Sequence, residues 1–173
     1  MKRRLAVVLL FTSAVLAQEK NPVSTVLKEA LPRQQKNLVA AAEEMPAEKY
    51  GYKPTEPQME FGHLVLHVLQ TNNSLCAKIG DVPEAKAAVP LKDSDGKDKL
   101  VEGLKASFDF CASALGKLDD SKLGDELELF GGRKGSRALA VFMLSNSWAD
   151  HYSEAAMYLR LSGLLPPTAQ PKK

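Results

Sequence analysis

The sequence predicts an all-α fold, a four-helix bundle, from three observations. Four segments carry apolar residues at the three- and four-residue spacings of helices that bury one face. Glycines and prolines separate these segments. A charged link of about fifteen residues, 81–96, joins the second segment to the third. A link of that length permits a crossover, so the second and third helices are able to run parallel.

The first predicted helix spans residues 24–45. Ser24 is the candidate N-cap, and Pro46 ends the run. Pro32 lies inside the segment, where we expect it to kink the helix or delay its start. The apolar face of this helix consists of Leu27, Leu31, Leu38, Ala41, Ala42 and Met45.

The second and third predicted helices are apolar on one side. The second runs from about residue 59 to residue 79, and Gly80 is its expected C-terminal stop. In the third, apolar residues follow one another at spacings of four, four, three, four and three, which is typical of a bundle helix. These residues are Leu100, Leu104, Phe108, Cys111, Leu115 and Leu118.

The fourth predicted helix begins near Ser136, after the glycine-rich stretch 131–135. It ends at Gly163, and the prolines at 166–167 prevent its continuation. Before it, residues 123–130 alternate leucine with glutamate, which indicates a short extended piece.

The N-terminus has the features of a secretory signal. Three basic residues precede an apolar run from Leu5 to Phe11, and Val15 and Ala17 form a V-x-A cleavage site before Gln18. The run is too short for a stable membrane span, which needs about 20 residues. We therefore expect an exported protein, periplasmic or secreted, whose mature chain begins at Gln18. Retention as an uncleaved anchor is the alternative.

The mature chain is expected to form one domain. Without the three basic residues of the signal, 20 basic residues face 21 acidic ones, and the formal charge falls from +2 to −1. With no basic block and only 6% aromatic residues, we expect no nucleic-acid partner. The expected organisation is a signal peptide at 1–17, the bundle at 18–167 and a flexible tail at 168–173.

Three stretches of the chain match one known family in their order and separation: MEFGHLVLHVLQTNNSLCAKIG, LKASFDFCASALGKL and DHYSEAAMYLRLSGLLPP. They resemble the DinB-like (DinB/YfiT-like) superfamily of four-helix-bundle metalloenzymes. The stretch AAEEMPAEKYGYKPT is similar to the family's connection between the first two helices. The resemblance covers nearly all of the mature chain and implies an up-down-down-up bundle. It also implies a small-molecule substrate and a homodimer, since dimers are common in the superfamily.

The resemblance further implies a divalent metal, often zinc or nickel, held by three histidines. One ligand comes from the second helix, and two ligands four residues apart come from the fourth. His67 matches the ligand of the second helix, and His151 matches the second ligand of the fourth. The first ligand of the fourth helix falls on Ser147, so the usual set of ligands is incomplete.

A third histidine offers a replacement for the missing ligand. His63 precedes His67 by four residues, so both imidazoles project from one helix face and are able to share a metal at roughly 2.0–2.1 Å. The candidate metal ligands are therefore His63, His67 and His151, with positions left open for water or substrate. Asp150 and Glu154 are candidates for a hydrogen-bond acceptor that orients a ligand, or for a general base. No catalytic residue is assigned.

Two functions remain open at this point. The first is an exported, metal-dependent hydrolase or transferase with this atypical histidine site. An intracellular thiol is an unusual cosubstrate outside the cytoplasm, which favours hydrolysis over transfer. The second is a non-catalytic, metal-free bundle that binds a small ligand or a partner protein, with the histidines in packing roles. A metal site completed by a carboxylate is a further variant of the first.

Cys76 and Cys111 are the only cysteines of the chain. Export permits a disulfide, and the topology implied by the resemblance places the two residues in neighbouring parallel helices. The alternative is a pair of small apolar side chains in the core. A catalytic cysteine is not favoured, because the helical surroundings of Cys111 are apolar.

Overall fold

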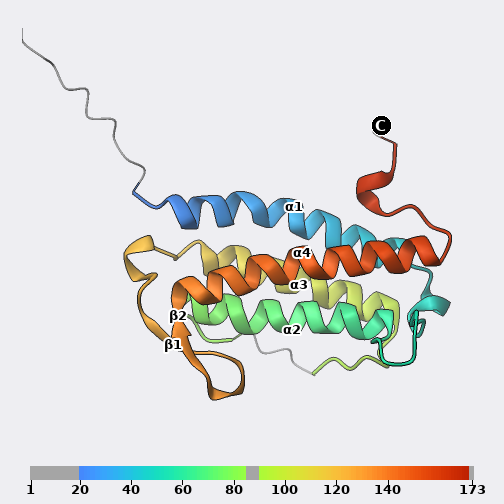
Figure 1. The fold of residues 1–173 in the computed structure, drawn as a ribbon, viewed down its shortest axis with the longest axis horizontal. Helices are drawn as coiled ribbons and strands as arrows, with labels where there is room; N and C mark the ends of the chain where they lie inside the picture. Colours follow the sequence, from blue (N-terminus) through green and yellow to red (C-terminus); the bar gives the residue numbers. More distant parts are fainter. Residues whose placement is uncertain (1–19, 85–89, 172–173) are drawn as a thin grey trace, which may run out of the picture.

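The computed structural model describes residues 20–84 and 90–171. The predicted signal peptide and cleavage site lie outside these residues, as does part of the link between the second and third helices. Within the described residues the chain forms four long helices and one two-stranded sheet (Figure 1). The predicted all-α four-helix bundle is confirmed.

The four helices are α1 (Pro22–Glu44), α2 (Phe61–Gly80), α3 (Lys97–Leu115) and α4 (Arg137–Leu161). In Figure 1, α1 and α4 run in one direction while α2 and α3 run in the other. Packing is closest between α2 and its neighbours α3 and α4, and between α1 and the same two helices. The long link thus returns the chain to the start of the bundle, and the topology is up-down-down-up.

The core is filled by apolar side chains from all four helices. The apolar face predicted for α3 is buried throughout, with Leu100, Phe108 and Leu115 fully inaccessible. Trp148 of α4 is also fully buried and packs against Phe108, with ring centroids 5.9 Å apart. Burial of these large side chains supplies the main favourable term in folding.

A buried polar network crosses this core. Asn72 of α2 is completely inaccessible, and its carboxamide oxygen accepts a hydrogen bond from Trp148 Nε1 at 2.7 Å. Its Nδ2 donates to Ser107 Oγ on α3 at 3.0 Å, and that hydroxyl donates to the carbonyl of Leu104 at 2.7 Å. One side chain therefore links three helices and sets their relative positions.

The start of α1 differs from the prediction. The helix begins at Pro22, and Ser24 is a buried residue of its first turn rather than the N-cap. Asp120 accepts hydrogen bonds from the backbone N–H groups of Val23 at 2.7 Å and Ser24 at 2.9 Å. The carboxylate of Asp120, distant in sequence, thus caps the N-terminus of α1 in place of a local side chain. Pro32 does not delay the start, since the helix continues through it.

The end of α2 also differs. Gly80 is the last helical residue rather than the stop, and Asp81 adopts the left-handed conformation with φ 53°. Gly80 is required for another reason, because a Cβ there would lie 2.5 Å from the carbonyl oxygen of Ala114. The close approach of α2 and α3 at this point accompanies the disulfide between Cys76 and Cys111.

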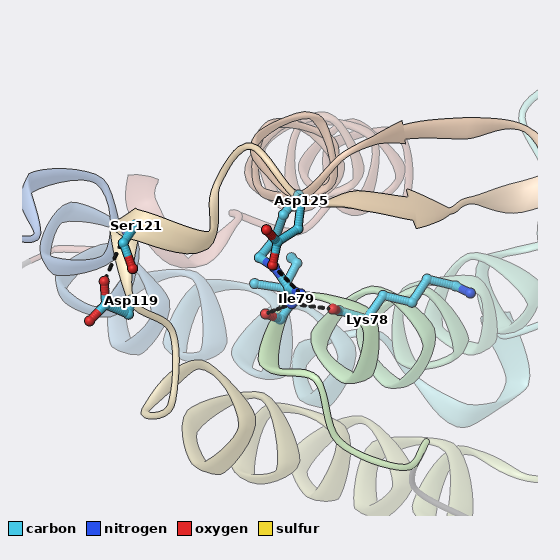
Figure 2. Close-up of polar contacts among 6 residues, drawn as sticks. Lys78, Ile79, Asp119, Ser121 and Asp125 are labelled. Atoms are coloured by element: carbon cyan, nitrogen blue, oxygen red, sulfur yellow. Dashed lines mark hydrogen bonds and ion pairs between the residues drawn. The ribbon is translucent and has the colours of Figure 1, made fainter.

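A buried arginine caps the C-terminus of α2. Arg137 is 4% exposed, and its Nη1 donates to the carbonyl oxygens of Lys78 at 2.8 Å and Ile79 at 2.7 Å. Its Nη2 lies 3.4 Å from Asp125 Oδ2, and Figure 2 shows this carboxylate beside the last turn of α2. A cation at this position satisfies orphan carbonyl groups and complements the helix dipole.

A short hairpin precedes α4. The extended piece predicted within 123–130 is present as β1 (Glu126–Glu128) and pairs antiparallel with β2 (Lys134–Ser136). The partner strand was not predicted. Gly131 and Gly132, with φ of 68° and 73°, provide the left-handed turn between the strands. Ser136 then accepts a hydrogen bond from Leu139 N at 3.2 Å, which confirms the predicted start of the fourth helix.

The chain after α4 returns to the bundle. In the turn Pro167–Ala169, Thr168 Oγ1 accepts a hydrogen bond from the hydroxyl of Tyr152 at 2.8 Å. Gln170 Nε2 donates to Glu44 Oε2 at 3.3 Å. Among the described residues, none of the helices has the length and apolar character needed to cross a membrane.

Candidate functional site

A groove of about 820 Å³ lies between the antiparallel helices α2 and α4. His67 and His151 line one end of it, together with Ser147 and Asp150. The other end lies about two helical turns away, at roughly 12 Å for eight residues of helix. The apolar side chains Leu75, Phe130, Leu139, Phe142 and Met143 line that end. Apolar side chains therefore gather beyond the histidines, where Ser74 and Glu84 also line the groove.

His67 and His151 face each other across the groove. Their ring centroids are 4.8 Å apart, and the rings meet edge to face at 85°. The contact arises because the two helices run antiparallel, which sets the first half of α2 against the second half of α4. The expected proximity of these two residues is thus present, and both imidazoles open into the same groove.

Glu154 orients the imidazole of His151. Its Oε2 lies 2.8 Å from His151 Nδ1, and the histidine side chain is only 15% exposed. A carboxylate at this distance favours the proton on Nδ1 of a neutral ring, which leaves the lone pair on Nε2. A carboxylate that holds a histidine in this way is the usual outer partner of a metal ligand. Of the two acidic residues considered from the sequence, Glu154 has this role and Asp150 lines the groove.

The environment of His67 favours its neutral form. Burial lowers the pKa of His67 below the usual 6.5, and the neighbouring His151 and His63 lower it further. A neutral imidazole keeps a lone pair for a metal ion or for a hydrogen-bond donor at neutral pH.

This lowered pKa predicts a pH-dependent stability. Because the folded protein holds His67 neutral, it binds fewer protons than the unfolded chain as the pH falls below about 6.5. The stabilisation is complete above that pH and is lost as the pH falls through the lower pKa of the folded state. In chelator-treated protein, we expect the melting temperature to fall between about pH 7 and pH 5, and to fall less in a His67→Gln variant. Thermal unfolding followed by circular dichroism measures both profiles, and identical slopes would contradict the expectation.

His63 takes a different partner. Its Nδ1 lies 3.3 Å from Asp93 Oδ2, and both side chains are about half exposed. In the described part of the chain, no three histidine, cysteine, aspartate or glutamate side chains are grouped so as to hold one ion. The structure thus brings His67 and His151 together without His63, which pairs with Asp93 of the link between α2 and α3.

Comparison with known proteins addresses the fold. No protein-family model matches the chain, and no curated protein matches it. A DinB-like protein from Bacillus subtilis has a similar structure, with a TM-score of 0.66 and 21% identity over 85% of this chain and 99% of that one. This chain has the DinB-like fold. A DinB-like protein from Bacillus cereus (TM-score 0.66, 14% identity, 82% of this chain and 93% of that one) is also similar. So is a conserved protein from Enterococcus faecalis (TM-score 0.64, 13% identity, 80% and 96%).

Ser147 decides how well this DinB-like bundle fits a metal ion. Its Oγ is buried and has no hydrogen-bond partner, and it lies one turn before His151 in the wall of the groove. A neutral hydroxyl is a weak donor for a transition metal compared with imidazole. Among the described residues, the imidazoles of His67 and His151 are therefore the two strong metal donors at this end of the groove, and Ser147 does not supply a third.

The apolar part of the groove was not predicted from the sequence. Phe142 is 63% exposed and Phe130 is 48% exposed, although both are large aromatic residues. Phe142 departs from the apolar stripe of its helix, and this departure was the available signal. Phe130 is the last residue of the predicted extended piece, and only the hairpin brings it to the groove.

Proposed function

We propose that the groove is the active site of a divalent-metal-dependent hydrolase or transferase acting on a small molecule, with His67 and His151 as the protein ligands of the metal. The observation that carries the proposal is the edge-to-face pair of imidazoles, 4.8 Å apart, with Glu154 on the outer nitrogen of His151. Histidine pairs ordered in this way are typical of zinc and nickel sites.

Each residue has a defined task in this proposal. Glu154 keeps the Nε2 lone pair of His151 directed away from the carboxylate, and burial keeps His67 neutral and able to donate its own lone pair. A bound zinc or nickel ion would supply Lewis-acid chemistry and lower the pKa of a water molecule. Asp150, in the wall of the groove, is the candidate acceptor for the proton of that water.

We also propose that the protein acts outside the cytoplasm. The signal-like N-terminus supports export, and so does the Cys76–Cys111 pair, because a disulfide persists in an oxidising compartment. Hydrolysis is favoured over transfer to a thiol, since an intracellular thiol is an unusual cosubstrate in that location.

A metal-free binding bundle is the second candidate. It is favoured by the donor set, which has a serine hydroxyl at the third position and pairs His63 with Asp93. In this function the two imidazoles and the buried hydroxyl of Ser147 would supply hydrogen bonds to a small ligand.

Titration of tag-free protein with Zn²⁺ and Ni²⁺ in a calorimeter separates the two candidates. We expect one site per chain, and a loss of affinity of more than about tenfold in His67→Ala and in His151→Ala, since loss even of an outer partner costs that much. Ser147→His should raise the affinity, because it supplies a third imidazole to the buried position.

His63→Ala is the matched control on the same helix. It removes an imidazole one turn away that pairs with Asp93, and we expect metal affinity within about twofold of the starting protein. An effect as large as that of His67→Ala would bring His63 into the site. Absence of metal binding in both the starting protein and Ser147→His would reject the metalloenzyme and favour the metal-free bundle.

A further inference from the structure

A second hollow, of about 520 Å³, lies on the opposite side of α4, between α4 and α1. Its walls are almost entirely apolar, and Phe142 lines both this hollow and the histidine groove. On α4, Leu139 and Met143 face the groove while Ala138 and Val141 face the second hollow, so Phe142 lies on the ridge between the two. The two hollows are therefore adjacent, and the exposed aromatic ring of Phe142 forms a wall of each.

The exposed apolar side chains of the protein concentrate here. Among the described residues, seven large hydrophobic side chains are exposed, and four of them line the two hollows. Val26 on α1 is 64% exposed and Phe142 is 63% exposed. Contiguous apolar surface of this kind on a soluble domain marks a binding site. The four side chains are Val23, Val26, Phe130 and Phe142.

Hydrogen-bonding groups converge at the histidine end of this surface, and further polar side chains, among them Ser74 and Glu84, line the groove beyond it. The imidazoles of His67 and His151 and the unpartnered hydroxyl of Ser147 offer hydrogen bonds to one small polar group. Glu84 and Asp150 also line the groove, whereas no lysine or arginine among the described residues does. The acidic lining opposes an anionic head group, and both carboxylates are exposed to solvent, which weakens their attraction for a cationic one. These residues therefore favour a neutral head group.

We infer that the ligand of this site is a neutral single-chain amphiphile, with an ester or amide head at His67 and His151 and an aliphatic chain that crosses Phe142 into the hollow between α1 and α4. The inference rests on the proposed function, because it names the substrate class of the same site. A narrow chain fits two concave hollows on either side of a ridge. A protein partner would bind more readily to a flatter surface than this one, or it would need two projections that fill the two hollows.

Monoacylglycerols of increasing chain length are the probes for this inference. Their binding is measured by calorimetry below the micelle-forming concentration, with a chelator present so that no metal is needed. We expect the affinity to rise about fourfold for each added methylene from the butanoyl to the decanoyl ester, since burial of a methylene is worth about 0.8 kcal/mol. Decanoate, which has the same chain length and an anionic head, should bind more weakly than the decanoyl ester.

Single substitutions on the exposed surface test the path of the ligand's aliphatic chain. Phe142→Ser should weaken binding of the decanoyl ester by at least about fivefold, and Val26→Ser should do so for a longer tetradecanoyl ester but not for the decanoyl ester. Leu161→Ser is the matched control, because Leu161 is an equally exposed apolar residue of α4 that lines neither hollow. All three side chains are more than half exposed, so the variants should fold.

Several outcomes would overturn the inference. Affinity that is independent of chain length, tighter binding of decanoate, or an equal loss in Leu161→Ser each excludes the proposed path. A dimer that Phe142→Ser converts to a monomer would assign the surface to a second copy of the chain instead. Failure of the two proposals is distinguishable: Zn²⁺ binding without acylglycerol binding rejects this inference alone, and acylglycerol binding without any metal affinity rejects the metal site alone.

Discussion

Replacing both Cys76 and Cys111 by alanine lowers the free energy of unfolding by about 3–4 kcal/mol. The bridge closes a segment of 35 residues that contains the whole link between α2 and α3. Without it, the unfolded chain gains the entropy of opening that loop, while the folded chain loses only two small buried side chains. Urea unfolding at equilibrium measures the loss as a shift of the midpoint and of the extrapolated free energy.

Reduction of the unaltered protein is the control for this expectation. A reductant breaks the crosslink and leaves both cysteines in the core, so it separates the loop entropy from the packing of the side chains. We expect reduced protein and the double variant to be destabilised to a similar extent. Equal stability of oxidised and reduced protein, or two free thiols found by mass spectrometry in protein from an oxidising compartment, would show that the bridge does not form.

Asn72→Ala is expected to cost about 2–4 kcal/mol of unfolding free energy. The substitution removes the acceptor for Trp148 Nε1, which lies in a fully buried residue with no route to water. It also leaves a small cavity where three helices meet. The loss of the hydrogen bond to Ser107 costs less, because that hydroxyl keeps its hydrogen bond to the carbonyl of Leu104. Denaturant unfolding monitored by fluorescence of Trp148, the only tryptophan, measures the change.

A double-mutant cycle with Trp148→Phe isolates the hydrogen bond. In the phenylalanine background there is no indole N–H to leave unsatisfied, so Asn72→Ala should cost about 1–3 kcal/mol less than in the unaltered protein. Circular dichroism replaces fluorescence for the variants without tryptophan. Strictly additive effects of the two substitutions would contradict a role for this hydrogen bond in stability.

Much of the fold was predictable because helices are local structures. The four apolar stripes, the N-cap at Ser136 and the break at Gly163 depend on residues within a few positions of one another, and all are present. The extended piece near residue 127 was also predicted, since its alternation is a local pattern. The up-down-down-up order came from the resemblance to the DinB-like family rather than from the periodicity.

The errors occurred where a distant residue decides a local feature. Ser24 has the sequence context of an N-cap, but the N–H groups of the first turn of α1 donate to Asp120, 96 positions away from Ser24. Gly80 has the sequence context of a helix stop, but it lies inside α2, and its lack of a side chain allows Ala114 of α3 to approach closely. In both cases the partner is brought into place only by packing of the bundle.

In the candidate site too, some features follow from local sequence and others depend on tertiary packing. The sequence by itself determined the helices and the histidines that they carry, because periodicity and spacing are properties of neighbouring residues. The resemblance to the DinB-like family predicted that His67 meets His151, and the structure brings the two together. Only the tertiary structure decided that Glu154 rather than Asp150 holds the ring, and that His63 pairs with Asp93. The same holds for the exposed ring of Phe142 between two hollows. These features depend on helices that run antiparallel and on side-chain directions across an interface, and no local pattern encodes either one.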